Sequence, residues 1–82
     1  GRGFIFCENQ AEIDRLWAAI KDGGKVLACG WIKDRWGLTW QIVPTRLQEL
    51  LDDPDPARSR RAMEAMMKME KLDIAALERA AG

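Results

Sequence analysis

The stretch Cys29–Trp40, "CGWIKDRWGLTW", decides the fold of this chain. A charged turn, Lys33–Arg35, interrupts it, and Gly37 offers the positive φ that a tight hairpin turn needs. Apolar, β-prone segments flank the turn on both sides, over Val26–Ile32 and Leu38–Val43. The pattern therefore predicts a β-hairpin with three tryptophans in or beside its turn: Trp31, Trp36 and Trp40.

Side chains of the second hairpin strand alternate between two faces, because successive residues of a strand point in opposite directions. One face carries Leu38, Trp40 and Ile42, and the other carries Thr39, Gln41 and Val43. We interpret Trp40 as a core residue because it shares its face with leucine and isoleucine. Trp31 and Trp36 lie nearer the turn, and core, pocket wall and partner contact remain open for both.

Upstream of the hairpin, residues 3–8 form a short apolar run that predicts a first strand. Asn9 follows as a helix N-cap, and Glu12 completes a capping box. Gly23-Gly24 ends this helix. Its apolar positions recur at helical spacing and predict one buried face: Ile13, Leu16, Trp17 and Ile20.

Downstream of Pro44, the sequence predicts three helices. Thr45 with Gln48 reads as a capping box for a short helix that carries Leu47, Leu50 and Leu51. Asp55-Pro56 starts a second helix that extends to about Lys71, since proline is favoured at the first helical position. Asp73 caps the last helix, with Leu72 and Leu77 placed as a hydrophobic staple. We expect one α+β domain over 1–82, with a module at 1–44 and a helical tail at 45–82.

Composition excludes several classes of function. Thirteen basic residues balance thirteen acidic ones, so no excess positive charge attracts nucleic acid. No apolar run reaches the length of a membrane span, and the two cysteines indicate reduced thiols in a cytoplasmic protein. Histidine is absent, which removes the most versatile acid–base group and a common metal ligand. No nucleophile elbow, Walker loop or G-x-G-x-x-G motif is present, so no cofactor is expected.

Two clusters in the tail have plain structural interpretations. Met63, Met66 and Met67 share a helix face, which favours packing or an interface. Arg58, Arg60 and Arg61 lie close to three aspartates, which favours a solvated face that neutralises itself.

Three segments together resemble one protein family: "CENQAEIDRLWAAIKDGG", "CGWIKDRWGLTWQIVP" and "LLDDPDPARSRRAMEAMMKMEKLDIAALERA". The resemblance is to the PhnB-like branch of the vicinal oxygen chelate superfamily, which includes glyoxalases and bleomycin-resistance proteins. Members of this branch often carry the label demethylubiquinone methyltransferase. The unit of the superfamily is a βαβββ module, and two modules form a cup that holds the ligand. The chain resembles the second module plus a C-terminal helical tail.

The resemblance has two structural implications. A fourth strand is expected, either through a split of the Val26–Ile32 segment or as an irregular strand. Catalytic members of the superfamily place a glutamate metal ligand at the position of Gln41 and a histidine on the first strand, which would fall at or before Gly1. Because an amide is a poorer ligand for transition metals than a carboxylate, the chain is expected to bind no metal.

These observations lead to a functional hypothesis: a small-molecule-binding module whose ligand contacts Trp31, Trp36, Thr39 and Gln41. Two alternatives remain open. One is a vicinal oxygen chelate enzyme whose site residues come from a partner chain, and the other is a purely structural dimerisation module. In each case we expect a homodimer, or a separate first module, to complete the cup.

Overall fold

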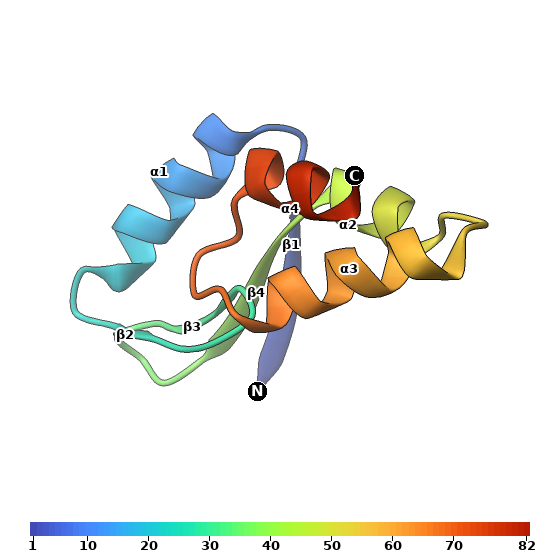
Figure 1. The fold of residues 1–82 in the computed structure, drawn as a ribbon. Helices are drawn as coiled ribbons and strands as arrows, with labels where there is room; N and C mark the ends of the chain where they lie inside the picture. The colour runs from blue at the N-terminus through green and yellow to red at the C-terminus, as the bar shows by residue number, and fades with distance from the viewer.

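The computed structural model describes residues 1–82, and its strands and helices follow the order βαβββ and then ααα. The class is α+β, as predicted. Figure 1 shows the elements: β1 (Arg2–Cys7), α1 (Gln10–Lys21), β2 (Lys25–Val26), β3 (Trp31–Lys33), β4 (Thr39–Pro44), α2 (Thr45–Leu51), α3 (Pro56–Met67) and α4 (Ile74–Ala81). No helix has the length and apolar character needed to cross a membrane.

The four strands form one mixed sheet in the order β1-β4-β3-β2. β1 lies parallel to β4, and the other two pairings are antiparallel. The expected split of Val26–Ile32 is confirmed, because β2 ends at Val26 and β3 begins at Trp31. Cys29 and Gly30 both have positive φ, 59° and 82°, which bends the backbone out of the extended conformation between the two strands.

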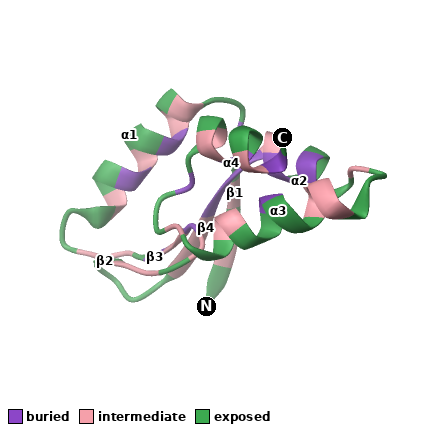
Figure 2. Ribbon diagram, in the orientation of Figure 1, coloured by how far each residue is buried: buried purple, intermediate pink, exposed green.

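Helix α1 covers one face of the sheet. Asn9 is its N-cap and accepts a hydrogen bond from the Glu12 amide at 2.9 Å, as predicted. The Glu12 carboxylate bonds to the amide of Glu8 instead of the cap's own amide. Trp17 is buried, which confirms its core assignment, and Figure 2 shows the buried positions recurring along α1. The buried residues of this layer are Cys7, Ile13, Trp17, Ile32 and Ile42.

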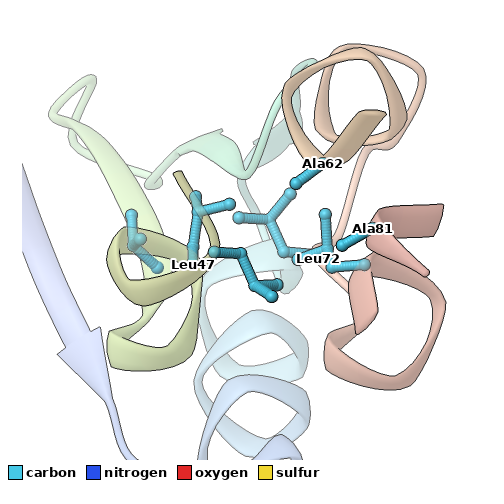
Figure 3. Packing of buried hydrophobic residues seen from close by; sticks show 7 residues of the cluster. Leu47, Ala62, Leu72 and Ala81 are labelled. Carbon is cyan, nitrogen blue, oxygen red and sulfur yellow. The ribbon is translucent and has the colours of Figure 1, made fainter. Parts of the chain in front are cut away.

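The tail helices form a second core at the end of the sheet where β4 passes into α2 (Figure 1). Leu72 and Leu77 are both fully buried in it, as the predicted staple requires. Figure 3 shows how side chains from all three tail helices converge with the end of β4. The members are Val43, Leu47, Leu50, Ala62, Leu72, Leu77 and Ala81.

Two predicted helix boundaries are wrong. The Thr45–Gln48 capping box does not form: Pro44 is the N-cap of α2, and the Thr45 hydroxyl donates to Glu8 at 3.3 Å. Helix α3 ends at Met67 rather than near Lys71. Its end is set by tertiary contact, because the carbonyls of Met69 and Glu70 accept hydrogen bonds from the amides of Cys29 and Gly30.

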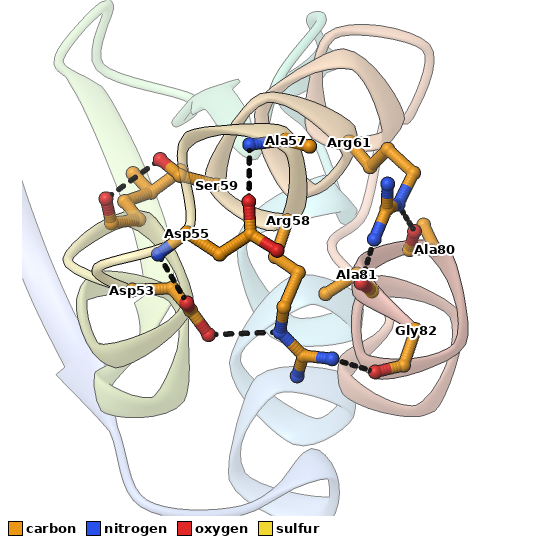
Figure 4. A network of polar contacts seen from close by, with 10 residues as sticks. Asp53, Asp55, Ala57, Arg58, Ser59, Arg61, Ala80, Ala81 and Gly82 are labelled. Carbon is orange, nitrogen blue, oxygen red and sulfur yellow. Dashed lines mark hydrogen bonds and ion pairs between the residues drawn. The ribbon is translucent and has the colours of Figure 1, made fainter.

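The arginines of α3 hold the tail together. Arg58 pairs with Asp53 at 2.9 Å and also donates to the carbonyl of Gly82, while Arg61 donates to the carbonyls of Ala80 and Ala81 (Figure 4). These donors satisfy carbonyls at the C-terminus of α4, where a positive charge is favoured. The predicted self-neutralised face holds for Arg58, but the role of Arg61 as a helix cap was not predicted.

The methionines divide between two environments. Met66 packs against the tail core, whereas Met63 and Met67 are 39% and 63% exposed. Packing within the chain therefore holds for Met66 only, and an interface stays a prediction for Met63 and Met67.

Asp34 organises the hairpin turn. One carboxylate oxygen accepts from the amides of Trp36 and Leu38, and the other accepts from Trp40 Nε1 at 3.0 Å. The hydrogen bond from Trp40, followed by those from the backbone amides, lowers the pKa of Asp34 below its usual range. A carboxylate with a depressed pKa stabilises the folded state above the pKa of the unfolded chain. That stabilisation is lost as the pH falls through the lower pKa of the folded state.

We expect Asp34→Asn to lower the melting temperature by several degrees at pH 7. The amide oxygen can still accept from the backbone, but the amide nitrogen meets the Trp40 Nε1–H, which is itself a donor. The difference from the parent should shrink as the pH falls through the depressed pKa of Asp34, where the folded carboxylate becomes protonated. Melting curves across this pH range test the expectation, and a constant difference at every pH would contradict it.

Candidate functional site

The sheet face opposite α1 is the candidate site. Side chains that pack toward α1 include Ile5, Ile32, Trp40 and Ile42. Strand alternation therefore sends their neighbours to the other face, and strand register arranges these neighbours in rows. Across the sheet, one row is Arg2, Thr39, Lys33 and Lys25, and the next row is Phe4, Gln41 and Trp31. Phe6 lies beyond Phe4 on β1. We call these eight residues the open face.

The open face is rich in uncovered aromatic surface. Phe4 is 59% exposed and Phe6 is 64% exposed. The ring centroids of Phe4 and Trp31 lie 5.5 Å apart, and those of Phe4 and Phe6 lie 6.4 Å apart. Large apolar side chains gathered on an uncovered surface are typical of binding sites and interfaces.

Gln41 lies in the middle of the aromatic row, between β1 and β3. Its side-chain nitrogen donates to the carbonyl of Cys29 at 2.8 Å. This bond links β4 to the turn before β3, where Cys29 adopts its left-handed conformation. Gln41 thus has a structural role at the position where the resemblance expects a metal ligand, and its amide oxygen is the group that remains for a ligand.

The row next to the aromatics is cationic. Arg2 lies over the ring of Trp31, with its guanidinium carbon 5.6 Å from the ring centroid. Arg2, Lys25 and Lys33 take part in no ion pair within the chain. The strand positions of the open face carry no acidic residue. This part of the surface therefore favours the binding of a negatively charged ligand.

The structure brings together three of the four predicted site residues: Trp31, Thr39 and Gln41. Trp36 lies apart from them. It is 78% exposed, stacks with Arg35 at 5.4 Å, and lines a shallow hollow beside the α1 residues Ala19 and Ile20.

Sequence reasoning missed Phe4, Phe6 and the three cations of the open face. The β1 run "FIF" was taken as a uniformly apolar strand. The alternation of Phe4 and Phe6 with Ile5 and Cys7 was a signal that could have placed the two rings on one face.

Other parts of the molecule offer less to a ligand. Burial, followed by repulsion from Glu12, raises the pKa of the Cys7 thiol, which makes it a poor nucleophile. No group of three or more histidine, cysteine, aspartate or glutamate side chains converges. The largest hollow, about 390 Å³, lies between the start of α1 and the start of α4. Of its carboxylates, Glu8 already accepts from Thr45, Asp73 caps α4 and Glu78 pairs with Arg46.

Comparison with known proteins identifies the sheet module. The family model described as 3-demethylubiquinone-9 3-methyltransferase matches residues 3–43, which is half of the chain. The chain belongs to this family. The match covers almost all of the βαβββ module of this chain and stops before the tail helices. No curated protein matches the sequence. Seven of the eight open-face residues lie on the matched part, and Arg2 lies one residue before it.

Proposed function

We propose that the chain is a PhnB-like, glyoxalase-type module that binds a small molecule on its open face. The observation that carries the proposal is the cluster of Phe4, Phe6 and Trp31, in which both phenylalanines are exposed and Trp31 is half-buried. α1 covers one face of the sheet and the tail packs at its end, so the fold positions this aromatic surface without enclosing it. The βαβββ order and the parallel β1–β4 pairing support an assignment to the vicinal oxygen chelate superfamily.

A thermal-shift screen of small molecules tests this function. A ligand that binds only the folded chain raises its melting temperature. In a Phe4→Ser, Phe6→Ser double variant, the shift should be lost while the unliganded protein stays folded, because both rings are already exposed. Met67→Ser is the matched control, since Met67 is as exposed as Phe6 but lies on α3. Ligands that shift the double variant as strongly as the parent would contradict the proposal.

The proposed binding does not depend on a metal. Gln41 uses its amide nitrogen to hold Cys29, and the other residues of the open face are aromatic, cationic or hydroxyl side chains. Such a set lacks the imidazole, thiolate and carboxylate groups that hold transition metals.

We therefore expect elemental analysis of the purified chain to find no stoichiometric transition metal. The measurement should follow dialysis against a weak chelator, which removes adventitious ions. One zinc, iron, manganese or nickel ion per chain would contradict the expectation and favour the enzyme alternative.

A second copy is the proposed partner that completes the cup. β1 is an edge strand of six residues with no proline, so one side of its backbone is unpaired. A two-fold pair is the commonest closed assembly, and with its axis perpendicular to the sheet it would place two open faces side by side.

We expect light scattering to give a dimer mass at tens of micromolar. Hydrogen exchange adds a residue-level test, because alternate amides of β1 point away from β4 and have no partner within the chain. In a dimer paired through β1, these outward amides should exchange slowly. A monomer mass, with fast exchange at every outward amide, would contradict the proposed assembly.

A further inference from the structure

The open face consists of two chemically different strips, which the strand register separates. The aromatic strip consists of Phe4, Gln41 and Trp31. The cationic strip, one step along the strands, consists of Arg2, Thr39, Lys33 and Lys25. Residues of the same face are two positions apart along a strand, which corresponds to about 7 Å. A flat molecule of one or two rings therefore reaches both strips at once.

From this juxtaposition we infer that the ligand is a planar aromatic anion, which lies on Phe4 and Trp31 with its acidic group toward Arg2 and Lys33. The inference rests on the proposed function and specifies its ligand class. The rings of Phe4 and Trp31 are inclined to each other at 58°, so a planar ligand stacks on one ring and meets the other edge to face.

Charge complementarity supports an anion over a neutral ring. The open face brings three cations and no acidic strand residue to one side of the sheet, in a chain whose total charge is balanced. None of the three cations is neutralised within the chain. Arg2 is already held over the Trp31 ring at 5.6 Å, beside the place where a stacked ligand would carry its charge. Polar groups remain to orient the ligand, namely the Thr39 hydroxyl and the Gln41 amide oxygen.

The test compares two probes of the same shape, 2-naphthoate and the neutral 2-naphthalenemethanol. Each is titrated into the ¹⁵N-labelled full chain and followed by NMR. We expect naphthoate to shift the Trp31 indole, the Gln41 side-chain amide and the amides of β1. It should bind about fivefold more tightly than the neutral probe at low salt, and the advantage should shrink at high salt.

Charge variants locate the anion. Lys33→Gln and Arg2→Gln should each weaken naphthoate binding about threefold and leave the neutral probe unchanged. Arg15→Gln is the matched control, because it removes the same charge from the exposed side of α1 and should change neither affinity.

The outcomes separate this inference from the proposed function. Equal binding of both probes at the open face, insensitive to Lys33→Gln, would overturn the anionic ligand and leave the binding face standing. Shifts confined to residues outside the open face, with either probe, would overturn both. Selective, salt-sensitive binding of naphthoate at Trp31 and Gln41 would support both.

Discussion

Trp40→Ala is expected to lower the free energy of unfolding by about 3 kcal/mol, toward the low end of the range for large aromatic deletions. Trp40 packs against the layer between α1 and the sheet, and it is partly rather than fully buried. Its loss also leaves Asp34 without one of its three hydrogen-bond donors. Because small domains are stable by only about 5–15 kcal/mol, the midpoint of urea unfolding should fall clearly.

A second substitution identifies the contact responsible. The Trp40 ring lies over Gly3 of the neighbouring strand, and a Cβ added to Gly3 would come within 2.6 Å of it. We expect Gly3→Ala to destabilise the parent but to cost much less in the Trp40→Ala background, where the ring is absent. Additive effects in this double-mutant cycle, or an unchanged midpoint for Trp40→Ala, would show that the ring does not pack against β1.

Gly24→Ala is expected to have the other large effect, about 3 kcal/mol or more. A Cβ at this position would lie well inside van der Waals contact with the carbonyl oxygens of Ile20 and Lys33. Both obstacles are backbone atoms, one in α1 and one in β3, so neither can move without displacing its element. Urea unfolding followed by circular dichroism would measure the loss.

Gly37→Ala provides the control for Gly24→Ala. Gly37 has a positive φ of 88°, but nothing lies within 4 Å of an added Cβ. Its substitution should cost roughly 1–2 kcal/mol, which reflects left-handed backbone strain alone. Equal effects for the two glycines would mean that the close packing of α1 against β3 does not control stability.

Periodicity and capping were sufficient to predict where most helices begin. The recurrence of Ile13 and Trp17 placed α1, and Asp55-Pro56 and Asp73 placed the starts of α3 and α4. These signals act within a few residues of the chain, so a single sequence carries them in full.

The errors arose where distant segments meet. Helix α3 stops at Met67 because the following carbonyls pair with Cys29 and Gly30, and no local pattern indicates that pairing.

Prediction of the site was limited in the same way by contacts between distant segments. Trp31, Thr39 and Gln41 were found from the hairpin and the family resemblance, whereas Phe4 and Arg2 reach them only through the β1–β4 register. Trp36 was grouped with the site by its nearness in sequence, although its side chain lies beside α1.

The parallel pairing of β1 with β4 sets the order in which the chain can fold. Residues 2–7 must find residues 39–44 across the whole of α1 and the hairpin, which is a slow search for a small domain. The tail helices, by contrast, contact one another over short loops and can associate early. A refolding chain whose tail orders first would leave β4 unpaired and expose the sheet edge that β1 later covers. Mutations that slow α1 formation should therefore increase aggregation during refolding even where the folded chain is little destabilised.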